Sequence, residues 1–112
     1  MLTLDALRSW GANVDEAMQR CLNNENFYLM LVQKGLQDPN FDRLPEAVAA
    51  GDLDKAFDAA HALKGVTANL ALTPILKPVQ EITELLRGKT DTDYAPLLTE
   101  ISTQKESLKK LF

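Results

Sequence analysis

The side chains best suited to chemistry in this sequence lie around its only histidine. His61 is followed by Lys64 at i+3 and by Gly65 at i+4. On a helix these spacings place the three residues on one side, so a cation and a position without a side chain adjoin the imidazole. An imidazole nitrogen can attack phosphorus, and phosphoryl transfer asks little of a protein beyond positioning and charge stabilisation. The segment therefore predicts a phosphohistidine site, in which Lys64 stabilises the added charge and Gly65 leaves space for it.

A helix over residues 53–70 is expected to position this site, with Asp52 as its N-cap. At 100° per residue, one stripe of small and apolar residues faces the core. The stripe consists of Leu53, Ala56, Ala60, Leu63, Thr67 and Leu70. His61 lies about 130° from the centre of this stripe, which predicts a side chain at the surface or in a groove between helices. A glycine within a helix costs about 1 kcal/mol relative to alanine, so Gly65 indicates either needed space or a close helix contact.

Helical periodicity also dominates the rest of the chain, and no segment alternates convincingly between polar and apolar residues. Further helices are predicted over 3–10, 14–37, 39–50, 73–87 and 94–111. Their single apolar faces and short connections predict an all-α protein, an up-and-down four-helix bundle with an additional short N-terminal helix or helices. The chain has no internal repeat and no long linker, so residues 1–112 are expected to form a single domain.

Residues that favour helix ends set the expected boundaries. The predicted N-caps are Thr3, Asp52 and Thr73, the last followed by Pro74 at the first helical position, and the predicted stops are Gly11, Gly51 and Gly88. The pair Asn23 and Asn24 could break the 14–37 stretch, because Asn favours caps over helix interiors. Pro78 lacks an N–H, so it either kinks its helix or delays the helix start.

Composition and charge exclude several classes of protein. The chain has 112 residues, of which 46% are hydrophobic and 25% charged, so it can bury a core without disulfides. Its net charge of −4, with no basic cluster beyond Lys109 and Lys110, argues against nucleic-acid binding. The N-terminus lacks the basic start of a signal peptide, and no apolar run is long enough to span a membrane. A cytoplasmic protein is therefore expected.

Neither cofactor nor metal is expected in this chain. Its one cysteine, Cys21, excludes an internal disulfide, and one Cys with one His cannot form a protein-only zinc site. The sequence contains no cluster of oxygen ligands for a hard cation and no glycine-rich nucleotide loop.

Residues 61–70, His-Ala-Leu-Lys-Gly-Val-Thr-Ala-Asn-Leu, resemble the signature of histidine-containing phosphotransfer (HPt) domains, H-x-L-K-G followed by small residues. The likeness covers about residues 10–88, including 14–20, 26–31, 50–53 and 75–88, and the last helix fits in length. The resemblance implies that His61 accepts a phosphoryl group from the aspartate of a receiver domain, such as that of a hybrid histidine kinase. His61 then passes the group to the receiver of a response regulator.

The resemblance also implies a monomeric phosphocarrier without an ATP site, which takes part in transfer but is not itself a kinase. The Mg²⁺ that such transfers need is then held by the receiver domain and not by this chain. A helical adaptor on the same fold that has lost phosphotransfer is the alternative. The intact His61-x-Leu63-Lys64-Gly65 motif argues against this alternative.

Two positions depart from the family pattern. Ala71 stands where the family usually has glycine, so the turn after the histidine helix could differ in shape. Thr83 stands where the family often has a Gln or Glu that hydrogen-bonds and orients the imidazole. Gln80 and Glu84, about one turn to either side of it, are the other candidates for this orienting role.

Overall fold

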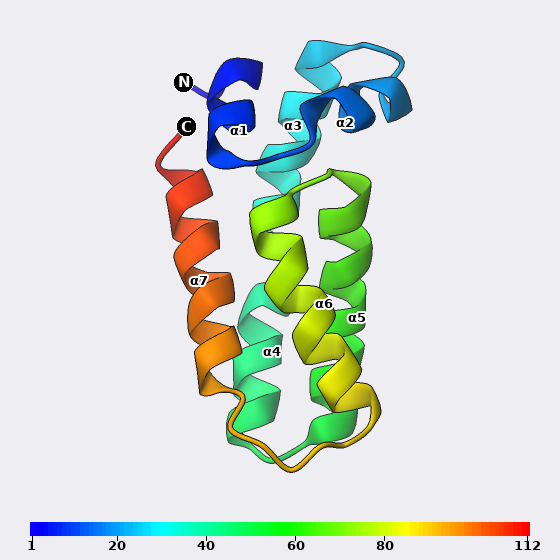
Figure 1. Cartoon of the computed structure of the whole chain (residues 1–112), viewed down its shortest axis with the longest axis vertical. Helices are drawn as coiled ribbons and strands as arrows, with labels where there is room; N and C mark the ends of the chain where they lie inside the picture. The colour runs from blue at the N-terminus through cyan, green and yellow to red at the C-terminus, as the bar shows by residue number, and fades with distance from the viewer.

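The computed structural model describes residues 1–112 and contains seven helices and no strand, which confirms the predicted all-α class (Figure 1). The helices are α1 (Leu4–Trp10), α2 (Val14–Arg20), α3 (Glu25–Leu36), α4 (Asn40–Ala49), α5 (Leu53–Asn69), α6 (Thr73–Arg87) and α7 (Ala95–Lys109). Most of the observed ends lie within one or two residues of the predicted ones. No helix combines the length and the apolar composition needed to cross a lipid bilayer.

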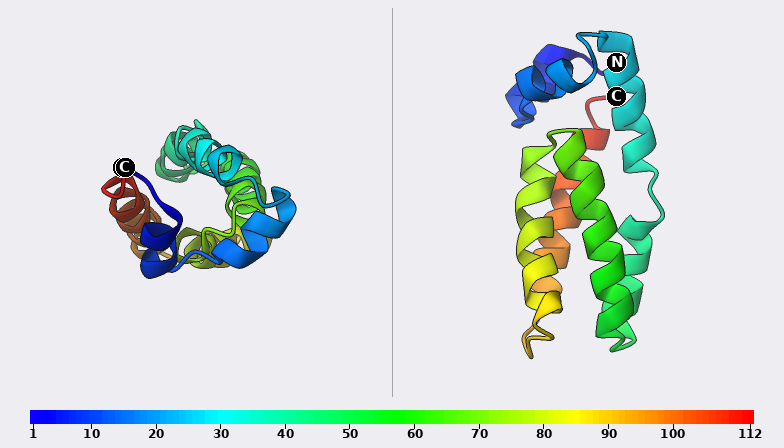
Figure 2. Two further views of the ribbon diagram at one scale, coloured as in Figure 1. Left: turned by 90° about the horizontal axis from the view of Figure 1, so that it is seen from above. Right: turned by 90° about the vertical axis from the view of Figure 1, so that its right-hand side faces the viewer.

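Helices α4 to α7 form the bundle, in which α5 packs against α4 and α6, and α6 also packs against α7. The turns between α4, α5 and α6 are short, so these helices alternate in direction (Figure 1). Helix α3 continues beyond the end of α4, and α1 and α2 lie across that end of the bundle, where both termini also lie (Figure 2). A single cluster of buried apolar residues runs through the molecule, from Leu2 to Leu108.

The predicted break in the 14–37 stretch is confirmed. Residues 21–24 separate α2 from α3, and Asn23 adopts a left-handed backbone with φ 59°, a conformation that asparagine tolerates. The side chain of Asn24 accepts a hydrogen bond of 3.0 Å from the Phe27 amide and so caps α3. Tyr28 and Val32 of α3 are buried in the core, so the apolar face continues after the break.

Two of the three predicted N-caps are confirmed. Thr3 and Asp52 each accept a hydrogen bond from a backbone amide three residues later, at 3.1 and 3.0 Å. The prediction for Thr73 is wrong, because Thr73 is the first residue of α6 and Leu72 occupies the cap position without a side-chain hydrogen bond. Leu72 is almost completely buried, so its side chain contributes to the core and not to capping of the helix amides.

Helix α6 runs from Thr73 through Pro78, so of the two alternatives for Pro78 the later start is excluded. Pro78 is buried together with Ile75 and Val79 on the face of α6 that packs into the bundle. Burial of this apolar face offsets the hydrogen bond that proline cannot make. Helix α4 similarly contains Pro45 in its interior, which the pattern did not single out.

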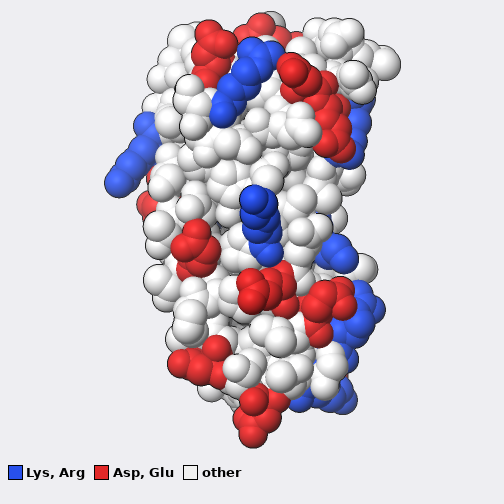
Figure 3. Space-filling model, viewed as in Figure 1, with Lys and Arg blue, Asp and Glu red and all other residues white.

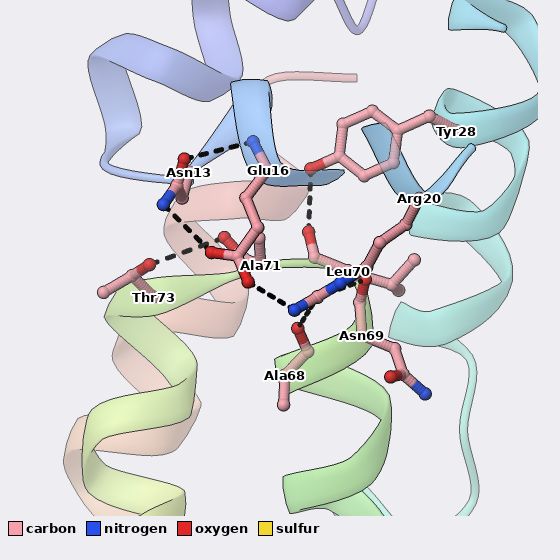
Figure 4. Close-up of polar contacts among 9 residues, drawn as sticks. All are labelled: Asn13, Glu16, Arg20, Tyr28, Ala68, Asn69, Leu70, Ala71 and Thr73. Atoms are coloured by element: carbon pink, nitrogen blue, oxygen red, sulfur yellow. Dashed lines mark hydrogen bonds and ion pairs between the residues drawn. The ribbon is translucent and has the colours of Figure 1, made fainter. Parts of the chain in front are cut away.

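The turn between α5 and α6 has the shape that a glycine would give. Ala71 adopts a left-handed backbone with φ 55°, a conformation that glycine takes more readily than alanine. The amide of Asn13 donates a 2.9 Å hydrogen bond to the Ala71 carbonyl, and the Tyr28 hydroxyl donates a 2.8 Å bond to the Leu70 carbonyl (Figure 4). Burial, with a smaller contribution from Cys21, raises the pKa of Tyr28 to about 12, so the hydroxyl remains a donor at neutral pH.

Arg20 of α2 caps the C-terminal end of α5. Its guanidinium donates hydrogen bonds to the carbonyls of Ala68, at 2.6 Å, and Asn69, at 3.1 Å, and also pairs with Glu16 (Figure 4). The last carbonyls of a helix lack partners within the helix, and a cation is favoured at that end of the helix dipole. Residues N-terminal to the bundle therefore hold the end of the helix that carries His61.

Replacing Tyr28 with phenylalanine tests this support. Tyr28→Phe removes the only side-chain donor to the Leu70 carbonyl, within a buried environment that water does not easily enter. We expect a loss of about 1–2 kcal/mol in the free energy of unfolding, because a buried acceptor is left unsatisfied. Chemical denaturation measures the loss, and hydrogen exchange of the Leu72 amide, which bonds to Thr67, reports on the turn itself. Unchanged stability and unchanged exchange would contradict the supporting role.

Candidate functional site

His61 lies near the middle of α5 with its side chain exposed, as the periodicity predicts. Five residues of the predicted stripe, Ala56, Ala60, Leu63, Thr67 and Leu70, are buried, and Leu53 is half-buried against the core. The Thr67 hydroxyl is satisfied within the helix by a 2.8 Å bond to the Leu63 carbonyl. The core thus fixes the rotation of α5, and His61 necessarily points outward.

The imidazole is held by an aromatic contact that occupies none of its nitrogen atoms. The ring of Phe57, one turn earlier, stacks on His61 with the ring centroids 5.6 Å apart and the planes at 14°. No protein group forms a hydrogen bond with the imidazole. The i, i+4 spacing of Phe57 and His61 in the sequence could have indicated this contact, although the sequence analysis did not single out Phe57. The stacking limits the ring orientation and leaves a nitrogen free to react.

Two cations from different helices lie around the Phe57–His61 pair. Lys64 follows it on α5, and the Arg87 guanidinium at the end of α6 lies over the Phe57 ring, 5.0 Å from its centroid. Both cations share one counter-ion, because Glu84 contacts the Lys64 amine at 3.9 Å and the Arg87 Nε at 3.4 Å. The sequence does not reveal the role of Arg87, since only the packing of α6 against α5 brings it here.

Gly65 faces open space. A Cβ atom added to Gly65 would have no neighbour within 4 Å, so the glycine is not needed for a close helix contact. Gly35 of α3 shows the contrast, because a Cβ there would lie 2.8 Å from a methyl group of Leu70. Of the two interpretations of Gly65, the geometry favours open access beside His61.

None of the three candidates for orienting the imidazole forms a hydrogen bond with it. Thr83 is buried, and its hydroxyl donates to the Val79 carbonyl at 2.6 Å within α6. Gln80 is exposed, and Glu84 is engaged with the two cations. The residue at the family's orienting position therefore faces the core, because the apolar face of α6 sets its rotation.

The surroundings of His61 are an open surface. The groove with a volume of about 440 Å³ between α4 and α5 is lined by other residues, including Arg43, Asp52, Lys55 and Asp58. Acidic and basic side chains are interspersed over the face seen in Figure 3, with basic groups along its right-hand edge. Asp54, one of the carboxylates near His61, pairs with Lys89 at 3.4 Å. No three His, Cys, Asp or Glu side chains are grouped so that they could hold a metal ion.

A histidine exposed on a bundle helix, with a lysine one turn later and a glycine that faces open space, defines a helical protein with an accessible imidazole. The Hpt domain model matches residues 34–111, which include His61 and all of α4 to α7. The chain belongs to the Hpt domain family, as the sequence motif predicted. Comparisons with curated proteins and with solved structures gave no match.

Hpt domains are phosphocarriers in phosphorelays, not kinases, and they interact with receiver domains. The matched range begins within α3, so the likeness noted for residues 14–20 and 26–31 lies outside it. The residues that cap the end of α5, among them Arg20 and Tyr28, also lie outside the matched range.

Proposed function

We propose that this chain is a histidine phosphotransfer protein that relays a phosphoryl group between the aspartates of two receiver domains through His61. The observation that carries the proposal is the exposed imidazole, free of hydrogen bonds and next to an open glycine, in a chain of the Hpt family. A phosphoryl group that passes between side chains of two proteins needs such an accessible acceptor.

In the first transfer, an imidazole nitrogen of His61 attacks the phosphorus of the donor's phospho-aspartate. The new N–P bond forms, the O–P bond to the aspartate breaks, and the donor leaves as a carboxylate. The second transfer reverses these steps on the receiver of a response regulator. The donor is expected to be the receiver of a hybrid histidine kinase, and the Mg²⁺ that the reaction needs is held by the receivers.

The neighbouring residues supply positioning and charge. Phe57 limits the orientation of the imidazole, Lys64 stabilises the phosphoryl oxygens, and Gly65 lets the receiver approach. We further propose that residues 1–112 act as one monomeric domain. The continuous core and the hydrogen bonds from Arg20 and Tyr28 to the end of α5 support the single domain.

Mass spectrometry tests the proposed function. Phosphoramidate, a small phosphodonor, and a phosphorylated receiver domain are each incubated with the protein. We expect the addition of one phosphate that is labile in acid and stable in alkali, and that maps to His61. The alternative, a helical adaptor without phosphotransfer, predicts no added phosphate from either donor, and that result would refute the proposal.

Lys64→Ala should slow phosphorylation by phosphoramidate by about three- to tenfold, equivalent to about 0.7–1.4 kcal/mol of transition-state stabilisation. The phosphoryl group brings roughly two negative charges next to an amine that this variant lacks. The free energy of unfolding should change by less than about 0.5 kcal/mol, because the ion pair between Lys64 and Glu84 is partly exposed. Lys77→Ala, an exposed lysine elsewhere on α6, is the matched control. Equal rates for the two variants would leave Lys64 as an ordinary surface lysine.

A further inference from the structure

Glu84 is the shared counter-ion of Lys64 and Arg87. Its two carboxylate oxygens contact different partners, with Oε1 3.9 Å from the Lys64 amine and Oε2 3.4 Å from Arg87 Nε. The partners come from different helices, so Glu84 joins α5 to the end of α6 beside His61. In the unphosphorylated protein, one negative charge therefore faces two positive ones.

Both cations are also connected to the imidazole. Lys64 lies one turn after His61, and Arg87 lies over the same Phe57 ring that stacks on the imidazole. The guanidinium, the phenyl ring and the imidazole thus form a continuous series from α6 to α5. The contact with Phe57 keeps the guanidinium beside the stacking partner of the imidazole even if its pair with Glu84 breaks.

We propose that Glu84 is an internal counter-ion that competes with the phosphoryl group for Lys64 and Arg87, and that Arg87 is the second cation of the phosphohistidine site. The proposal rests on the proposed function. A phosphoryl group carries about −1.5 to −2 charges against −1 for the carboxylate, so it attracts the two cations more strongly once it is on His61. All three side chains are partly exposed and can move to make the exchange.

This exchange makes Glu84 a positioning residue that opposes phosphorylation. Its carboxylate holds the cations away from the incoming phosphoryl group and repels that group by its own charge. Glu84 forms and breaks no covalent bond. When phosphoramidate is the donor, the imidazole nitrogen attacks phosphorus, the donor's P–N bond breaks, and ammonia leaves.

Glu84→Gln tests the proposal with phosphoramidate as the probe. The variant keeps the shape of the side chain but removes its charge, so both cations become available to the phosphoryl group. We expect His61 to be phosphorylated about two- to fivefold faster, the range that corresponds to one exposed ion pair. Arg87→Ala should slow the same reaction by a similar factor. In a protein that already lacks both Lys64 and Arg87, adding Glu84→Gln should give little acceleration.

Glu81→Gln is the matched control. Glu81 lies one turn earlier on α6, is exposed, and pairs with neither cation, so its replacement changes the net charge equally. Equal rates for Glu84→Gln and Glu81→Gln would overturn the proposal. The proposal would also be overturned if Glu84→Gln gave the full acceleration in a protein without Lys64 and Arg87. Repulsion between the Glu84 carboxylate and the phosphoryl group would then explain the whole effect.

A second readout separates this proposal from the proposed function. The ¹⁵N chemical shift of Arg87 Nε should change in Glu84→Gln, and in the wild type it should change when His61 is phosphorylated. If the wild type takes up no phosphate, the proposed function fails and this proposal fails with it. This holds whatever the chemical shift of Arg87 Nε shows in Glu84→Gln. If His61 is phosphorylated but Arg87 Nε does not respond, the proposed function stands and the role of Arg87 is refuted.

Discussion

His61→Gln will take up no phosphate from phosphoramidate or from a phosphorylated receiver domain. His61 is the only histidine in the chain, so no other imidazole can replace it as acceptor. Glutamine is a good helix former of similar polarity, and the position is exposed and away from the core. The fold should therefore be retained, with a change of less than about 0.5 kcal/mol in the free energy of unfolding.

The measurement pairs phosphate incorporation, detected by intact mass, with a thermal melt of the same sample. A normal melt with no incorporation assigns the acceptor to His61. Undiminished incorporation would show that another side chain accepts the phosphate, and a collapsed melt would show that His61 has a structural role its exposure does not suggest. The alkali stability of the wild-type adduct distinguishes phosphohistidine from an acyl phosphate.

Gly65→Gln will strongly reduce transfer from a phosphorylated receiver domain, by about tenfold or more, while the protein remains folded. The open space beside Gly65 would be filled by a flexible side chain, next to the imidazole that the receiver must reach. A loss of this size corresponds to at least about 1.4 kcal/mol. Phosphorylation by the much smaller phosphoramidate should fall less, so comparing the two donors separates blocked docking from altered chemistry.

Gly65→Ala is the matched variant for this prediction. Its methyl group has no neighbour within 4 Å, so it should fit without displacing any atom. The helix should gain up to about 1 kcal/mol from the higher helix propensity of alanine, with transfer little changed. A large loss of stability in Gly65→Gln would instead indicate a packing role. A normal melt with normal transfer would remove Gly65 from the site.

Features that depend on residues within about one turn of each other could be predicted from the sequence. The all-α class, the caps at Thr3 and Asp52, and the break before α3 follow from periodicity and local hydrogen bonding. The exposure of His61 follows for the same reason, because the residues that turn α5 toward the core all belong to α5 itself. The open surface at Gly65 was one of two alternatives, and a neighbouring helix could have closed it.

Which residues from other helices reach the site depends on how the helices pack together. The packing of α6 against α5 brings Glu84 and Arg87 to the site. The same packing lets Leu72, and not Thr73, occupy the cap position of α6. Arg20 reaches the end of α5 from 48 residues away in the chain. Such contacts depend on how whole helix faces pack together, and the period of a single helix carries no information about its partner's position.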